Sequence, residues 1–314
     1  MRLEGRALAV VLPRESTLAC YDVAAGKEIF RAPTGSSPHD LCLSPDRRLL
    51  YLAVQGRPGT DPAAERVHAV DVFDLRKRTS VGSIPLGCHR RPHGIAIHSG
   101  GRLFVTCEED GTLLILRLED DSVHRTVLLD QSLPRAVVVS PDGRTAFTAN
   151  AGSASVSGVD VMMGVVLRQL ELGGRPEGMA FSPDGRFLHV AMPDQGAVVL
   201  IDAARIEEAG RIETGPCPVR VAVTPDGRRL FVLLHHGEAL EVLDTTTHKR
   251  LSSIPIEGRP TDLVMSLDGA AAFVSCEGAS KVEVVSPADA RVVASLATGG
   301  SPGAMLPLAL ADVT

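Results

Sequence analysis

The sequence Ser-Pro-Asp-Gly-Arg occupies residues 140–144 and again 182–186, and Thr-Pro-Asp-Gly-Arg follows at 224–228, so each copy lies 42 residues after the last. Degenerate copies start at Ser44, His98 and Ser266. A second marker, the turn x-Pro-x-x (the Pro turn), keeps the same spacing and starts at Ser37, Arg91, Leu133, Arg175, Cys217, Arg259 and Ser301. Two markers in phase over six units indicate a chain built from internal repeats.

Each repeat has the composition of four short strands. In the unit that begins at Arg175, the Pro-Asp-Gly triplet at 183–185 is typical of a hairpin whose glycine adopts a positive φ. The apolar runs around it are too short for helical periodicity. They predict strands at 178–181, 187–192, 197–202 and 210–213. Four short strands in about 40 residues are typical of a β-propeller blade.

The whole chain is therefore expected to be all-β, a single seven-bladed β-propeller over residues 1–314 with four antiparallel strands per blade. The predicted blades span about 37–90, 91–132, 133–174, 175–216, 217–258 and 259–300. The seventh unit has room for one strand after Ser301, and residues 1–36 offer three more near 8–12, 17–23 and 28–31. Pairing strand 301–314 with strands of 1–36 would close the ring and remove two exposed sheet edges.

The repeat resembles the YVTN-type β-propeller repeat. Its namesake segment is clearest at Phe147-Thr148-Ala149-Asn150, although other units carry Val54, Met192, Leu234 and Cys276 at the asparagine position. The resemblance covers nearly the whole chain and implies a lactonase-like propeller fold. It implies no single activity, because related propellers include sugar-lactone hydrolases, muconate-lactonising enzymes and non-enzymatic binding proteins.

Composition narrows the classes of partner. The net charge is −6, tryptophan is absent and aromatic residues make up 3% of the chain, so neither a basic surface nor a stacking platform for nucleic acid is expected. No stretch approaches 18 apolar residues, so we expect no membrane span. The six cysteines show no Cys-x-x-Cys pair, which favours reduced thiols and a cytoplasmic protein. A leader removed ahead of Met1 would instead indicate a periplasmic or secreted protein, and a monomer is the expected oligomeric state.

The variable positions of the repeat indicate a site. The two residues after each Pro are His39-Asp40, His93-Gly94, Arg135-Ala136, Glu177-Gly178, Val219-Arg220, Thr261-Asp262 and Gly303-Ala304. Seven equivalent turns around one axis should bring these side chains together at one mouth of the central channel. Propeller mouths are often polar without function, but a mixture of imidazole, guanidinium and carboxylate groups at non-repeated positions is a poor stability device and a plausible site.

The loops between second and third strands should lie on the same face and add candidates. The residues there are Gln55, Glu108, Glu109, Asn150, Asp194, His235, His236 and Glu277. The first repeat is 54 residues long, and its excess falls near 56–65, where two Pro and two Gly preclude helix and strand. This segment is either a plain insertion or a lid over the mouth.

The first functional hypothesis is a cofactor-free enzyme that acts on a small carboxylated or oxygenated substrate by lactonase, lactonising-cyclase, isomerase or lyase chemistry. His39, His93 and Glu177 would be catalytic. His39 or His93 would transfer a proton, because the charge of histidine changes near neutral pH, and Glu177 would act as a second acid or base or orient Arg135. Arg135 and Arg220 would hold a carboxylate in a bidentate fork. Further substrate-binding candidates are Asp40, Asp262, Asn150, His235, Glu108 and Glu277.

Two alternatives remain open. A divalent metal could be held by His39, His93 and a carboxylate such as Glu108, with Asp40 or Glu277 in its place, although no ligand spacing demands this. The other is a non-catalytic ligand-binding or scaffold propeller, which would leave a protein partner open. The scarcity of large aromatic residues speaks mildly against a protein-interaction hub.

Overall fold

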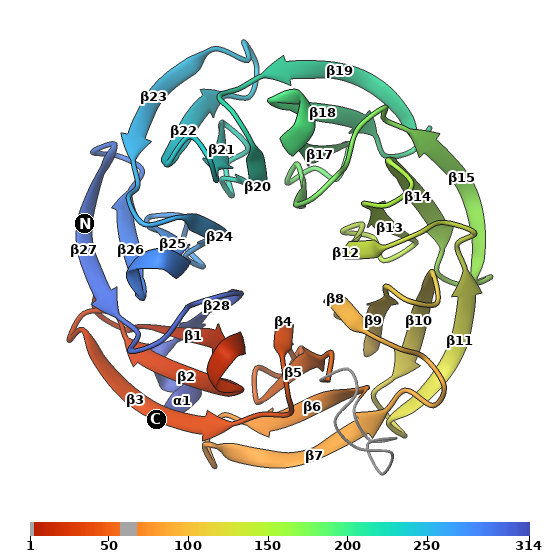
Figure 1. Ribbon diagram of the computed structural model, residues 1–314, viewed down its shortest axis with the longest axis horizontal. Coiled ribbons are helices and arrows are strands. Elements are labelled where there is room, and N and C mark those ends of the chain that lie inside the picture. Colours follow the sequence, from red (N-terminus) through yellow and green to blue (C-terminus); the bar gives the residue numbers. More distant parts are fainter. Residues whose placement is uncertain (1–2, 57–67) are drawn as a thin grey trace.

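Four-stranded antiparallel sheets surround a central axis in the computed structural model, which describes residues 3–56 and 68–314 (Figure 1). Seven such sheets form within these residues, so the predicted seven-bladed all-β propeller is confirmed. Inner strands surround the centre and the last strand of each sheet lies on the rim (Figure 1). The predicted lid at 56–65 lies outside the described residues except for Gly56.

The sheets follow the chain in order. The first sheet contains β4 (Pro38–Leu43), β5 (Leu49–Val54), β6 (Ala69–Asp74) and β7 (Thr79–Pro85), and the second contains β8 (Pro92–His98), β9 (Arg102–Cys107), β10 (Thr112–Arg117) and β11 (Ser122–Leu128). The third contains β12 (Pro134–Val139), β13 (Thr145–Asn150), β14 (Ser155–Asp160) and β15 (Val165–Glu171). The fourth contains β16 (Met179–Phe181), β17 (Phe187–Met192), β18 (Ala197–Asp202) and β19 (Glu207–Glu213).

The remaining elements complete the ring. The fifth sheet contains β20 (Pro218–Val223), β21 (Arg229–Leu234), β22 (Ala239–Asp244) and β23 (Arg250–Pro255). The sixth contains β24 (Pro260–Met265), β25 (Ala272–Cys276), β26 (Lys281–Ser286) and β27 (Arg291–Ala297). The closing sheet contains β28 (Met305–Ala309), β1 (Arg6–Leu12), β2 (Thr17–Asp22) and β3 (Lys27–Pro33). Short helices are η1 (Pro13–Glu15), η2 (Pro193–Gln195), η3 (Glu277–Ala279) and α1 (Leu310–Val313). None of the described helices has the length and apolar character needed to cross a membrane.

The hairpins behave as the Pro-Asp-Gly motif predicts. Gly143, Gly185, Gly227 and Gly269 all have φ between 68° and 70°. Arg47 occupies the same position with φ 59°, a conformation that costs a residue with a Cβ roughly 1–2 kcal/mol. The Ser or Thr that opens each motif accepts backbone N–H groups with its hydroxyl, as Ser140 does from Thr145 at 3.0 Å. The repeated motif is therefore structural.

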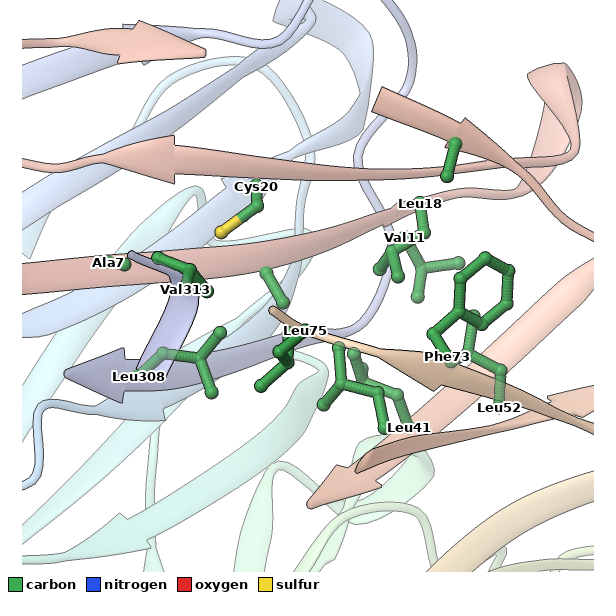
Figure 2. Packing of buried hydrophobic residues seen from close by; sticks show 13 residues of the cluster. Ala7, Val11, Leu18, Cys20, Leu41, Leu52, Phe73, Leu75, Leu308 and Val313 are labelled. Carbon is green, nitrogen blue, oxygen red and sulfur yellow. The ribbon is translucent and has the colours of Figure 1, made fainter. Parts of the chain in front are cut away.

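The core lies between adjacent sheets. Figure 2 shows one of these interfaces, in which Val11 and Leu18 of the closing sheet lie near Leu52 and Phe73 of the next sheet. The middle strands are nearly continuous buried runs, as in β5 and β21, so neighbouring sheets cover both of their faces. The wedge-shaped sheets thus pack into a ring whose inner strands line the channel.

The ring is closed by pairing the two ends of the chain. Strand β28 pairs with β1 in antiparallel register, with Leu8 opposite Pro307. The prediction ended the chain as a strand, but residues 310–313 instead form the helical turn α1. This turn places Asp312 against Arg47 of the next sheet, whose Nε and Nη2 donate to the two carboxylate oxygens at 3.2 and 2.6 Å.

Replacing Arg47 by alanine is expected to lower the free energy of unfolding by about 1–2 kcal/mol, because the Asp312 carboxylate loses its bidentate partner. Urea denaturation measures this change. The matched control is Arg144→Ala, whose side chain is 85% exposed and contacts Asp142 at only 3.9 Å, so it should change stability by less than about 0.5 kcal/mol. If the two substitutions had equal effects, the contact between Arg47 and Asp312 would not stabilise the closed ring.

Candidate functional site

A β-bulge in the inner strands explains how two successive residues can face one cavity. Side chains normally alternate between the two faces of a strand. After the Pro turn the pairing register shifts, between Pro38 and Asp40 and again between Pro260 and Asp262. A bulge inserts one extra residue and re-aims its side chain. His39 and Asp40 consequently line the same pocket, as do Thr261 and Asp262.

The pocket lies where the inner strands begin and has a volume of about 410 Å³. Its polar wall contains Arg14, His39, Asp40, His93, Arg135, Glu177, Arg220, Thr261, Asp262 and Glu277. These residues come from every part of the chain, yet the repeat brings them to one end of the ring. The channel mouth therefore holds a mixed set of acids, bases and cations.

Two histidine rings form the centre of the site. The rings of His39 and His93 have centroids 3.5 Å apart and planes inclined by 38°. Burial, helped by the positive charges of Arg220 and Arg135, lowers the pKa of His39 to about 3. Burial and the neighbouring His39 ring lower the pKa of His93 well below its ordinary value. Both rings are accordingly neutral at pH 7 and can accept a proton.

The two rings differ in their partners. The Nε2 atom of His93 lies 3.5 Å from Oε1 of Glu108, and the ring also meets the backbone of Arg135. Among the described residues, none hydrogen-bonds to the ring nitrogens of His39. His39 is thus the ring whose nitrogens remain available to a ligand, and His93 packs behind it.

A buried carboxylate organises one side of the pocket. The Glu108 side chain is 2% exposed and contacts three cationic or titratable groups. Nε of Arg135 donates to its Oε1 at 3.0 Å, and Nη2 of Arg91 lies 3.1 Å from its Oε2. Nη1 of Arg135 also donates to Glu177 at 3.2 Å. Arg135 is consequently held in one orientation between Glu108 and Glu177.

A second network holds Arg220 on the other side. Its Nε donates to Asp262 at 2.9 Å and its Nη1 donates to the Val219 carbonyl at 3.1 Å. Burial opposes the charge of Arg220, but the Asp262 carboxylate beside it raises the pKa of the guanidinium overall. The second Asp262 oxygen accepts the Met305 amide at 2.9 Å, which ties the network to the closing strand β28.

Asp40 is the carboxyl group in this site whose charge changes near neutral pH. Burial, together with the negative charge of Asp262, raises its pKa to about 6, although the amides of Ile95 and Leu41 donate to it at 3.1 and 2.9 Å. A carboxyl group with this pKa is protonated in a substantial fraction of molecules near neutrality. It can therefore give or take a proton in the pocket.

Neither guanidinium is saturated by the protein. The hydrogen bonds above use Nε and Nη1 of Arg135 and of Arg220, and within residues 3–56 and 68–314 no hydrogen bond engages either Nη2. Both side chains are partly exposed to the pocket. Each arginine therefore retains donors for an anionic ligand.

Two glycines set the spacing of the ring. A Cβ on Gly94 would lie 2.2 Å from the Arg135 carbonyl oxygen, and one on Gly178 would lie 2.8 Å from the Val219 carbonyl oxygen. The hydroxyl of Thr106 accepts the Gly94 amide at 2.9 Å and donates to the Arg135 carbonyl at 2.8 Å. The strand that carries His93 is thereby fixed directly against the strand that carries Arg135.

Comparison with known proteins yields the fold alone. No protein-family model matches the sequence, and no curated protein matches it. Among solved structures, the chain is similar to hydrazine synthase from Kuenenia stuttgartiensis, with a TM-score of 0.75 and 18% identity over 87% of this chain and 90% of that one. It is also similar to a protein of unknown function from Desulfotomaculum acetoxidans DSM 771, with a TM-score of 0.79 and 13% identity over 98% and 99%.

A third similar structure is dihydro-heme d1 dehydrogenase NirN in complex with DHE. Its TM-score is 0.69 and its identity 18%, over 93% of this chain and 63% of the NirN chain. These likenesses support the propeller and do not distinguish a YVTN-type or lactonase-like family, which stays a prediction.

The structure brings most of the predicted site residues together, but not all. His39, Asp40, His93, Arg135, Glu177, Arg220, Asp262 and Glu277 line the pocket, and Glu108 lies behind Arg135. Asn150 does not line it: this residue is fully buried and hydrogen-bonds to Thr148, Ser155 and Ser157 within its own sheet. His235 is also absent from the lining, and its Nδ1 bonds to the Pro260 carbonyl at 2.8 Å.

Three contributors escaped the sequence prediction. Arg14 on η1 lines the pocket and pairs with Glu277 on η3 at 2.5 Å, across two loops that project beside the mouth. Arg91 is the residue before its Pro and pairs with Glu108, and Thr106 is a hydroxyl inside a strand. Only Arg91 belongs to the repeated turn, so the repeat could have indicated that residue alone.

The metal alternative gains no support from donor geometry. Across the part of the chain that the structure describes, no three His, Cys, Asp or Glu side chains gather in an arrangement able to hold a metal ion. His39 and His93 face each other ring to ring, and Glu108 is already bound by Arg91 and Arg135. His93 and Glu108 are thus committed to contacts within the protein.

The depressed pKa of His39 predicts a specific pH dependence. As pH falls below about 6.5, an unfolded chain protonates this histidine while the folded protein, with a pKa of about 3, does not. Stability is therefore lost as pH falls from about 6.5, whereas Asp40, with its raised pKa, contributes in the opposite direction below about 6. His39→Gln should reduce the loss of unfolding free energy between pH 7 and pH 5 by about 2 kcal/mol.

Urea denaturation at the two pH values measures this difference. His124→Gln on the exposed strand β11 is the control for loss of one histidine and should keep the wild-type dependence. If His39→Gln also kept it, His39 would not be a buried neutral ring.

Proposed function

We propose that the pocket binds a small carboxylate or a related oxyanion and carries out acid–base chemistry of the lactonase, lactonising-cyclase, isomerase or lyase type. One observation carries the proposal: a neutral histidine, His39, lies beside two guanidinium groups, and no residue that the structure describes engages its ring nitrogens or either Nη2. Acid–base catalysis of an anionic substrate needs a base and an anion-binding group in one pocket.

Arg135 and Arg220 supply the anion-binding groups. Their carboxylate partners hold both guanidinium planes still, which reduces the entropy lost when a ligand binds. Hydrogen bonds from a guanidinium to a carboxylate are stronger than those between neutral groups. A carboxylate, or the oxyanion that develops on a carbonyl during reaction, would be stabilised by the two free donors.

His39 and Asp40 supply the proton transfers. In the hydrolysis of a lactone, His39 takes a proton from a water molecule as that water forms a bond to the carbonyl carbon. The arginines stabilise the resulting oxyanion, and the ring oxygen leaves with a proton from the protonated form of Asp40. The proton on His39 then passes to Asp40, which restores both groups. His93, held by Glu108 and stacked on His39, acts as a positioning residue in this scheme, and Glu177 orients Arg135.

The repeat supports a lactonase-like propeller as the family, and enzymes occur among the similar solved structures. At 18% identity those structures are evidence for the fold of this chain and not for its reaction. We propose a small-molecule ligand as the partner, acted on without a bound cofactor by a single chain.

The test uses a matched lactone and hydroxy acid, γ-valerolactone and 4-hydroxypentanoate. Calorimetry should detect binding of the acid, and Arg135→Met or Arg220→Met should weaken it by about 10-fold or more, because a hydrogen bond to a charged group is lost. His39→Gln should leave binding in place and slow lactone hydrolysis, followed by proton release, by about 10²–10⁴-fold. Arg144→Met, on an exposed hairpin, is the control.

A second candidate is a binding propeller without catalysis. Its supporting observation is that the charges of the pocket are mutually paired, Arg135 with two glutamates and Arg220 with Asp262, as in a site built for rigidity. Carboxylate binding that depends on the arginines, with no turnover of any lactone or hydroxy acid, would favour this candidate. No binding of carboxylates by the wild-type protein would overturn both.

A further inference from the structure

The pocket has two chemically different ends. Its charged residues lie at the Pro turns or on the helices η1 and η3. Further along the inner strands than these charged positions, the lining residues are Val137, Val138 and Met179. The charged mouth therefore leads into an apolar section of the channel.

Strand β12 fixes the distance between these ends. Arg135 stands near its start and Val138 follows three residues later, which corresponds to about 10 Å along a strand. Met179 opens the neighbouring strand β16 and lies two residues after Glu177. A ligand that reaches from the arginines to Val138 and Met179 thus spans a polar and an apolar zone.

We infer that the ligand is an amphipathic monocarboxylate whose carboxylate lies at Arg135 and Arg220 and whose aliphatic tail extends into the channel along Val138 and Met179. This inference rests on the proposed function and adds the substrate class to it. The pocket volume of about 410 Å³ accommodates roughly a dozen non-hydrogen atoms if each takes ~30 Å³. A medium-length fatty or hydroxy acid has this size.

The wall disfavours other anions of similar size. A second carboxylate at the far end would meet alanine, valine and methionine side chains and would lose its hydration without gaining a partner. A sugar acid would bury hydroxyl groups against the same surface. Both classes should bind more weakly than an acid with a saturated hydrocarbon tail.

The test is a calorimetric series of straight-chain monocarboxylates from acetate to octanoate with the full-length protein. Affinity should rise by about fourfold for each added CH₂ once the tail reaches Val138, because each buried methylene gains the same transfer free energy. Octanedioate should bind at least about tenfold more weakly than octanoate, since its second carboxylate would be buried without a partner.

Substitutions distinguish binding of the aliphatic tail from binding of the carboxylate. Val138→Thr keeps the side-chain volume but adds a hydroxyl, so it should weaken octanoate by about tenfold and leave acetate and propionate unchanged. Val139→Thr is the matched control, because Val139 follows on the same strand and does not line the pocket. Arg135→Met should weaken the whole series. Melting temperatures show whether each variant is folded.

The outcomes are distinct for the two proposals. If all chain lengths bind equally and depend on Arg135, the inferred tail site is wrong and the anion site stands. If octanedioate binds as tightly as octanoate, the inference is again wrong. If no member of the series binds the folded wild-type protein, the proposed function fails first and the tail site with it.

Discussion

Replacing Glu108 by glutamine is expected to lower the free energy of unfolding by about 2–3 kcal/mol. The side chain is 2% exposed and its carboxylate contacts Arg91, Arg135 and His93, so an amide would weaken the charge-assisted contacts of two partly exposed guanidinium groups. Urea denaturation at pH 7 measures the change.

The adjacent residue supplies the control. Glu109 is 50% exposed and lies 3.6 Å from Arg90, so Glu109→Gln should cost about 1 kcal/mol or less. A double-mutant cycle with Arg135→Met should show coupling to Glu108→Gln, because the two side chains are in direct contact and each single substitution removes the same ion pair. A loss below about 1 kcal/mol for Glu108→Gln would mean that the carboxylate does not organise the site.

Gly94→Ala is expected to destabilise the protein by about 3 kcal/mol and to weaken carboxylate binding. The added Cβ would lie 2.2 Å from the Arg135 carbonyl oxygen and 3.0 Å from the Val137 amide nitrogen, both backbone atoms that cannot rotate away. The strands β8 and β12 would have to separate, which moves His93 away from Arg135. Thermal unfolding and calorimetry with 4-hydroxypentanoate measure the two effects.

Gly82→Ala is the matched control, since a Cβ there meets no atom within 4 Å and the residue lies on the rim strand β7. It should change stability by less than about 0.5 kcal/mol and leave binding intact. Equal behaviour of the two variants would contradict the close approach of β8 and β12 as the device that sets the spacing of the site.

The repeat made the architecture predictable because its signals are local. The strands expected at 187–192 and 197–202 are β17 and β18, with the same bounds. The hairpin glycine and the short apolar runs act within a few positions, so no tertiary information was needed. The first and fourth strands were less accurate: 178–181 begins one residue later, and 210–213 begins three residues earlier at Glu207.

The repeat does not predict the orientation of side chains at the loops between the second and third strands of each sheet. Asn150 was expected at the mouth, yet Thr148, Ser155 and Ser157 form a polar niche that draws its amide into the sheet. Glu108 lies one position further along its own unit, where Ala151 stands in the unit of Asn150, and it is buried by the approach of Arg91 and Arg135 from neighbouring turns. Which way such residues turn depends on partners distant in sequence.

The closing sheet also determines when the pocket can exist. Leu8 and Pro307, which pair across β1 and β28, are far apart in the sequence, and Asp262 is held by the Met305 amide of β28. Joining ends so far apart has a large loop-closure entropy and makes for slow folding. The pocket is consequently incomplete until β28 has joined β1, and a ligand that binds only the closed ring would act as a pharmacological chaperone, favouring the closed form by mass action.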